Sequence, residues 1–197
     1  MKLAAVIGTV LAAAAVTCFP ARAAESDGHV DFFLGQKDLN SDYWKPIGSQ
    51  PEFGAVMSFG QDDWPVHIAV DVLLSVGQES RYDTFLGNTN TTGWTFEVDV
   101  GVRKIWKKGK VRPYLGGGLS SILTGLKSNS GGYVNSDERD QGSGVWAGTG
   151  VLFRLGQKFE LGLDVRYSSS WVEFGDVYGG GLDGGGFQYG ILLGFGF

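Results

Sequence analysis

Strict alternation of apolar and polar residues recurs in segment after segment of this chain, and it limits the possible folds more than any other feature. The pattern is clearest in residues 66–76, 93–106, 159–168 and 186–197. In the first of these, "VHIAVDVLLSV", Val66 and every second residue after it are apolar, while His67, Asp71 and Ser75 fall on the other face. A period of two is that of a β-strand with two different faces.

Weaker alternation in residues 30–37, 52–59, 111–121 and 145–155 brings the predicted total to about eight strands. Each is near the ~10 residues that a tilted strand needs to cross a bilayer.

The connections between these segments alternate in length. Residues 60–65, 107–110 and 156–158 are short, whereas residues 40–50, 77–91, 124–142 and 169–185 are longer and rich in Gly, Ser, Asn, Asp and Glu. Short turns at one end and long polar loops at the other are typical of an outer-membrane barrel.

A soluble barrel or sandwich also has alternating strands, but its bulky apolar face would have to fit inside. Here that face is too large for a narrow lumen, while the opposite face carries Gly, Ser and charged residues that suit one. Trp64, Trp94, Trp106 and Trp171 fall at predicted strand ends, where aromatic girdles lie. The predicted fold class is therefore all-β, an antiparallel up-and-down transmembrane β-barrel of about eight strands.

The first 23 residues are predicted to be a cleaved signal peptide. A basic start, an apolar stretch over residues 3–16 and the motif Ala21-Arg22-Ala23 support this interpretation. A membrane anchor would need ~20 apolar residues, and Thr17 is a poor residue before a lipoprotein Cys18. The barrel domain is expected to span residues 24–197.

Cleavage removes Lys2, Arg22 and the only cysteine, which moves the net charge from −5 to −7. The acidic balance argues against nucleic acid as a partner.

Three stretches, "VRPYLGGGLS" (111–120), "GVWAGTGVLFRLG" (144–156) and "YGILLGFGF" (189–197), resemble the small outer-membrane β-barrel superfamily. Within that superfamily, the stretches resemble the transmembrane domain of outer-membrane protein A and the opacity-type porins. In that superfamily the last strand ends in an aromatic residue and serves as an assembly signal. The positions that match are Tyr189, Ile191, Leu193, Phe195 and Phe197. The resemblance implies a porin-like monomer in the outer membrane of a Gram-negative bacterium, with the barrel-assembly machinery, lipid and lipopolysaccharide as its partners.

Simple short turns predict the registers of three hairpins, because paired residues must face the same side. Pairing Phe59 with Val66 sets Asp71 opposite Gly54. Pairing Trp106 with Val111 sets Asp99 opposite Gly118 and Arg103 opposite Tyr114. Pairing Leu155 with Phe159 sets Arg154, Asp164 and Arg166 opposite Glu160, Gly150 and Gly148, and it turns Trp146 inward.

Large lumen groups therefore face glycine, which makes room for them. Buried charges must pair or lose their charge, so a salt-bridge network is expected to fill the lumen. Its predicted members are Asp71, Glu97, Asp99, Arg103, Arg154, Glu160, Asp164 and Arg166. Such a network could be an inert plug or a gate for small ions.

No catalytic residues, cofactor or metal site are predicted. The mature chain would hold only His29 and His67, both near the periplasmic strand ends, whereas Ser168, Ser169 and Ser170 lie near the opposite rim without a base. Asp27, His29 and Asp31 are expected to be solvated at a frayed terminus, and the acidic residues 136–140 to form a solvated loop. The predicted function is structural or surface-interacting. A narrow channel for small or hydrophobic solutes is the alternative, and a lipid-modifying hydrolase comes third.

Overall fold

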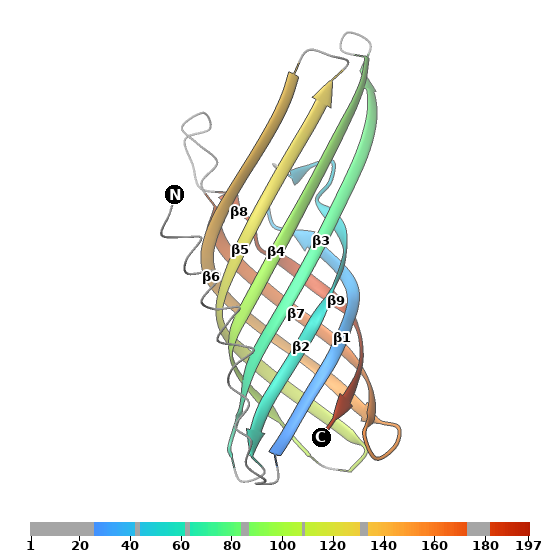
Figure 1. The fold of residues 1–197 in the computed structure, drawn as a ribbon, viewed down its shortest axis with the longest axis vertical. Coiled ribbons are helices and arrows are strands. Elements are labelled where there is room, and N and C mark those ends of the chain that lie inside the picture. Colours follow the sequence, from blue (N-terminus) through green and yellow to red (C-terminus); the bar gives the residue numbers. More distant parts are fainter. Residues whose placement is uncertain are drawn as a thin grey trace.

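Eight long antiparallel strands and one two-residue strand form a single closed sheet in the described part of the chain (Figure 1). The computed structural model describes residues 26–41, 44–61, 64–83, 87–107, 109–130, 134–172 and 182–197. The strands are β1 (Ser26–Leu39), β2 (Ser49–Gln61), β3 (His67–Asp83), β4 (Gly87–Ile105), β5 (Val111–Ser130), β6 (Val134–Arg154), β7 (Phe159–Val172), β8 (Leu182–Asp183) and β9 (Gly186–Gly196). The predicted signal peptide lies outside the described residues.

The sheet closes on itself because its first strand pairs with its last. Consecutive long strands are neighbours throughout, β7 pairs with β9, and β9 pairs with β1. At the seam, Gly28 and Phe197 exchange two backbone hydrogen bonds of 2.8 Å. The start of β1, the C-terminus and the short connections lie at the same end, here called the terminal end (Figure 1). This confirms the predicted up-and-down barrel.

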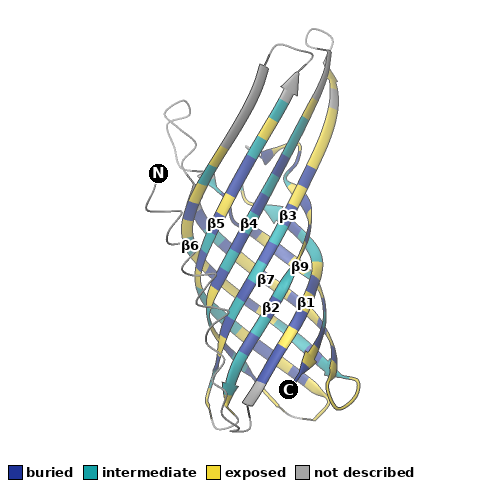
Figure 2. Cartoon of the chain, viewed as in Figure 1, coloured by how far each residue is buried: buried dark blue, intermediate teal, exposed yellow. Residues whose placement is uncertain are grey.

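Burial alternates along the strands as the sequence pattern predicts (Figure 2). Tyr189, Ile191 and Phe195 of the last strand and Phe197 just after it are exposed, while Gln188 and Leu192 point inward and are buried. The exposed residues form part of an apolar belt around the barrel. None of the described residues forms a helix that is long and apolar enough to span a membrane.

Strands β3 to β6 are taller than the rest of the barrel. They have 17 to 21 residues, whereas β1, β2, β7 and β9 have 11 to 14. We call β3–β6 the tall wall. Most of the predicted loops 77–91 and 124–142 are in fact paired strand, with Gly77 opposite Gly93 and Gly125 opposite Arg139. The loop prediction was wrong because alternation marks a strand only where one of its faces is apolar, and polar residues here follow the apolar belt on an unbroken ladder.

Two of the three predicted registers are wrong by two residues. Phe59 pairs with Ile68, which sets Asp71 opposite Val56, and Ile105 pairs with Tyr114, which sets Asp99 opposite Ser120 and Arg103 opposite Gly116. These two turns are wider than assumed. An even shift leaves every side chain on its predicted face. The third register is confirmed, with Arg154 opposite Glu160, Asp164 opposite Gly150 and Arg166 opposite Gly148.

The predicted tryptophan positions are met in part. Trp64 and Trp106 are exposed beside the short connections. Trp94 lies inside β4 rather than at its end, because the strand continues above it, and it pairs with Val76 where the apolar belt gives way to polar residues. The side chain of Trp171 lies outside the described residues.

Candidate functional site

The lumen gathers the charged side chains of the barrel, and Trp146 lies among them. Its side chain points inward with 3% exposure. The guanidinium carbons of Arg103 and Arg166 lie 5.7 and 5.9 Å from its ring centre, within the range of cation–π attraction. A Cβ added at Gly116 would lie 3.1 Å from the Trp146 ring, so this glycine provides space for the indole.

Arg166 on β7 is the centre of a group that we call the middle charge layer. Its Nε donates to Asp164 Oδ1 at 2.7 Å, and its Nη1 donates to Asp71 Oδ2 at 2.9 Å. Arg103 Nη2 donates to the same Asp71 oxygen at 2.7 Å, and Tyr114 donates to Asp164. Asp99 lies 3.8 Å from Arg166 Nη1. Because β7 is not a neighbour of β3 or β4 in the sheet, the contacts of Arg166 with Asp71 and Asp99 cross the lumen.

A second group lies toward the terminal end and centres on Glu160. His29 Nδ1 is 2.8 Å from Glu160 Oε2, and Arg112 and Arg154 each approach Oε1 to 3.4 Å. The His29 and His67 rings meet edge to face with centres 6.5 Å apart. The structure thus divides the eight predicted network residues among separate groups, with Arg154 and Glu160 here. The expectation of a solvated terminus was wrong for His29 and Asp31, whose side chains are buried.

A third group lies away from the terminal end, in what we call the upper lumen. Glu97 Oε2 accepts hydrogen bonds from Lys37 Nζ at 2.6 Å and from Gln188 Nε2 at 2.8 Å. Ser120 Oγ donates to Glu97 Oε1 at 3.2 Å. These partners come from β1, β9 and β5, so this group also crosses the lumen. Sequence reasoning missed Lys37 and Gln188, although each occupies an inward position by alternation along its strand.

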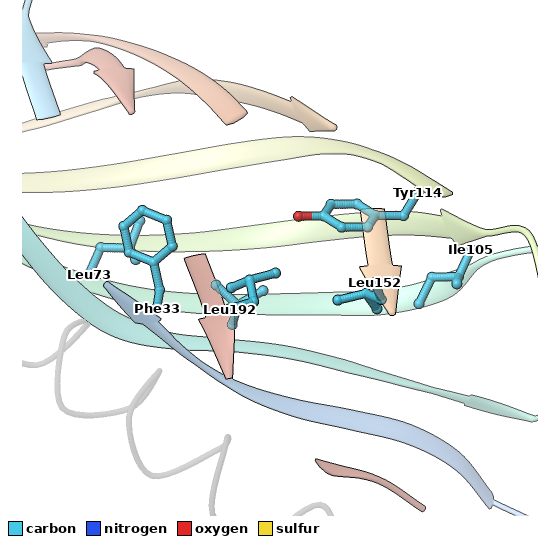
Figure 3. Packing of buried hydrophobic residues seen from close by; sticks show 7 residues of the cluster. Phe33, Leu73, Ile105, Tyr114, Leu152 and Leu192 are labelled. Carbon is cyan, nitrogen blue, oxygen red and sulfur yellow. The ribbon is translucent and has the colours of Figure 1, made fainter. Parts of the chain in front are cut away.

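An apolar cluster fills the space between the charged groups (Figure 3). The cluster as such was not predicted, although alternation already places two of its members, Leu73 and Leu192, on the inward face of their strands. In Figure 3, Phe33 lies beside Leu73, while Tyr114 lies nearer Leu152 and Ile105. Apolar packing that keeps water out strengthens the neighbouring ion pairs. The members of the cluster are Phe33, Val56, Leu73, Ile105, Tyr114, Leu152 and Leu192.

A closed eight-stranded barrel with an apolar outer belt and a charged lumen agrees with the comparison with known families. The model of the family described as "Outer membrane protein beta-barrel domain" matches residues 9–195. The chain belongs to this family. Its members lie in the bacterial outer membrane, which places this barrel there. A search of curated proteins found no significant match.

Solved outer-membrane barrels share the fold of this family member at low sequence identity. OprG from Pseudomonas aeruginosa is 11% identical with a TM-score of 0.59, over 87% of this chain and 96% of that one. A major outer membrane protein from Thermus thermophilus is 11% identical with a TM-score of 0.53, over 88% and 99%. Ail from Yersinia pestis, in complex with the heparin analogue sucrose octasulfate, is 12% identical with a TM-score of 0.52, over 88% and 100%.

In this outer-membrane barrel the histidines and the rim serines lie far apart. His29 pairs with Gly196 of β9, whereas Ser168 pairs with Gly186 of the same strand. Ten residues of extended strand correspond to about 33 Å. Ser168 Oγ accepts a hydrogen bond from Gln188 Nε2 at 3.2 Å. Among the described residues, no three His, Cys, Asp or Glu side chains are arranged to hold a metal ion.

Proposed function

We propose that this protein is a closed, non-conducting barrel that serves as a structural and surface-interaction protein of the outer membrane. The observation that carries this proposal is Arg166, which is 1% exposed and bonds to carboxylates on β3 and β7 while approaching a third on β4. A guanidinium held from several sides in this way leaves little room for an ion to pass. We infer no enzymatic activity.

The tall wall is the part of the molecule that suits contact with external molecules. Above the apolar belt its strands carry exposed polar side chains, among them Gln78, Ser80 and Asn90, and Tyr82 is 78% exposed. These residues lie on a paired ladder, with Tyr82 opposite Asn88. A paired sheet presents its side chains with less conformational freedom than a loop of the same composition.

Several features of the proposal concern its route to the membrane. We infer export with removal of residues 1–23, recognition of the strand that ends at Phe197 by the barrel-assembly machinery, and a monomer in a Gram-negative outer membrane with lipid and lipopolysaccharide around it. Exposure of Phe195 and Phe197 supports the assembly signal, because an assembly factor could reach these side chains.

Planar-bilayer recording tests the closed lumen. The folded barrel should give no single-channel conductance. The alternative is a narrow channel, and it is favoured by one observation: among the described residues, buried carboxylates outnumber buried lysine and arginine side chains. Steady, cation-selective conductance that Arg166→Ala alters would replace the closed barrel with that channel.

Cell adhesion tests the role of the tall wall. Cells that display the protein should bind to host-cell or abiotic surfaces better than cells displaying a variant in which residues 79–91 are replaced by a short turn. A heat-shifted gel band would show that the shortened barrel still folds. Equal adhesion of the two strains, with both barrels folded, would argue against a surface role for the wall.

A further inference from the structure

The connection between β1 and β2 folds over the upper lumen. We call its residues 44–48 the lid. Trp44 and Ile47 are 2% and 3% exposed, and Leu39 and Leu126 pack against them. Trp44 Nε1 donates to the backbone oxygen of Asp183 at 3.2 Å, which ties the lid to the rim between β7 and β9. Two large apolar side chains are thus withdrawn from water in a connection otherwise rich in polar residues.

The inner face of the tall wall provides the seat for this lid. Gly77 on β3 and Gly93 on β4 are directly paired. A Cβ added at Gly93 would clash with Ile47 Cδ1, and one added at Gly77 would lie 3.2 Å from the Ile47 backbone oxygen. Glycine at both positions therefore lets the lid lie against the wall.

A chain of polar side chains continues below the lid. Gln50 Nε2 donates to the Ile47 backbone oxygen at 3.0 Å, and Ser75 Oγ donates to Gln50 Oε1 at 2.7 Å. Ser75 and Thr95 hydroxyls are 2.7 Å apart, and Lys37 Nζ reaches Thr95 at 3.5 Å. Gln50, Ser75, Thr95 and Lys37 are all fully buried. The lid thus covers a chain of buried polar side chains that leads to the Lys37–Glu97 pair.

Glu52 lies in this region without a hydrogen-bond donor. Its side chain is 2% exposed, and neither carboxylate oxygen has a hydrogen-bond partner. Lys37 is committed to Glu97 at 2.6 Å. The Gln188 Oε1 oxygen is also buried without a hydrogen-bond partner. A buried carboxylate without a donor is destabilising, because it has lost its hydration and gained no hydrogen bond in return.

The charges around Glu52 do not balance. The largest electrostatic effects on Glu52 come from Lys37, Glu97, Arg166 and Asp164. With Glu52 included, two positive charges face three negative ones. Arg166 is, in addition, shared with Asp71 and Asp99. A single further positive charge beside Glu52 would neutralise the set.

We propose that the upper lumen is a binding site for a small monovalent cation, of the size and donor capacity of ammonium, with Glu52 as its main ligand and the lid as its cover. The unpaired Glu52 carboxylate supplies the charge, and Gln188 Oε1 offers a further acceptor. The middle charge layer closes the lumen beyond the site, so the cation enters and leaves past the lid. The site is independent of any surface partner of the tall wall.

Thermal unfolding of the purified, folded barrel at a fixed scan rate tests this site, with tryptophan fluorescence as the readout. Chloride salts of ammonium and of tetraethylammonium are compared at equal ionic strength, because the two ions carry the same charge and only the smaller one donates hydrogen bonds. Ammonium should raise the unfolding midpoint of the wild type by about 2–5 °C. Glu52→Gln should lose this increment, and Glu79→Gln, which removes an exposed carboxylate of β3, should keep it.

The rate at which a cysteine in the upper lumen reacts provides a second measurement, made on the lid-opened variant Gly93→Val. This measurement leaves Glu52 unchanged. A cysteine at Ser75 should react roughly tenfold faster with a cationic methanethiosulfonate than with an anionic one, relative to the same ratio at an exposed Ser80→Cys. Equal unfolding midpoints in ammonium chloride and tetraethylammonium chloride would contradict the proposed cation site. A midpoint that follows pH but not cation identity would also overturn it, since a proton on Glu52 would then replace the cation.

Discussion

The middle charge layer and the lid both close the lumen, one with charges on rigid strands and the other with apolar side chains on a connection between strands. Arg166 and Asp71 of the layer are 1% and 0% exposed, and their partners lie on strands that cannot move apart without opening the sheet. The lid contributes Trp44 and Ile47 from the rim, where displaced residues would meet water. Exposing an apolar side chain of the lid costs about 1.5–3 kcal/mol, whereas loss of one partner of a buried ion pair costs about 3–5 kcal/mol, so the lid should be easier to displace than the layer.

The largest effect should follow from Arg166→Ala. This change leaves Asp164 without its guanidinium, takes one of two from Asp71, and removes the ion pair to Asp99. Loss of one partner of a buried ion pair costs about 3–5 kcal/mol. We expect the free energy of unfolding in lipid vesicles, measured by urea titration, to fall by about that amount. Lys127→Ala, at an exposed position of the tall wall, should leave it within about 0.5 kcal/mol.

A second substitution separates lost charge pairing from lost packing at Arg166. Adding Asp164→Asn to Arg166→Ala removes a carboxylate that the first change left unpaired, so stability should partly return. If Arg166→Ala alone costs less than about 1 kcal/mol, water enters the layer freely and it does not close the lumen.

Two tyrosines provide a matched pair for the next prediction. Tyr114 is 2% exposed and donates to Asp164 in the middle charge layer, whereas Tyr82 is 78% exposed on the tall wall. Tyr114→Phe should lower the free energy of unfolding by about 1.5–3 kcal/mol, because a hydrogen bond to a buried carboxylate is lost. The same change at Tyr82 should have no measurable effect. Equal losses at the two positions would mean that the wall is packed as tightly as the lumen.

The contrast between the layer and the lid also explains what the sequence could predict. Asp71, Asp164 and Arg166 lie at inward positions of clearly alternating strands, so their burial followed from the period of two, and a register error of two residues did not alter it. Trp44 and Ile47 lie in a connection without periodicity, and their burial depends on contacts with strands distant in the sequence.

The same reasoning explains the missed members of the lumen. Lys37 is at an inward position, but its partner Glu97 is 60 residues away, and only the closed barrel brings them together. Alternation along their strands places Leu73, Leu152 and Leu192 on the inward face. Apolar character alone does not show this, because both the lipid face and the lumen face contain apolar residues. The height of the tall wall was missed because the polar ends of its strands lack alternation.

Asp183 should have a smaller effect than the layer, since it holds the lid from the rim. Its carboxylate accepts hydrogen bonds from Asn40 Nδ2 and from the backbone nitrogens of Ser170 and Gly185, each at 2.8 Å. Asp183→Ala should lower the free energy of unfolding by about 1–2 kcal/mol, and it should quicken labelling of a cysteine at Ser75. Asp183→Asn keeps one acceptor oxygen, so its unfolding free energy and its labelling rate should lie between those of the wild type and of Asp183→Ala. Unchanged labelling in Asp183→Ala would show that the rim does not restrain the lid.

Gly93→Val should have the smallest effect on stability and still open the lid. The new side chain competes with Ile47 for the seat, and Ile47 lies on a connection that can shift. Because the valine buries apolar surface of its own where Ile47 leaves it, the cost in unfolding free energy should stay below about 1 kcal/mol. In a Cys18→Ser background, a cysteine at Ser75 should nevertheless be labelled about tenfold faster, because Ser75 lies below the lid and is fully buried. Gly48→Ala is the matched control, since a Cβ there meets nothing within 4 Å.

A cysteine at Ser58, which bonds to Arg103 Nη1 at 2.8 Å, should stay unlabelled from the lid side in Gly93→Val, because the middle charge layer still closes the lumen above it. Labelling at both Ser75 and Ser58 would mean that the lid, and not the middle charge layer, is the main closure of the lumen.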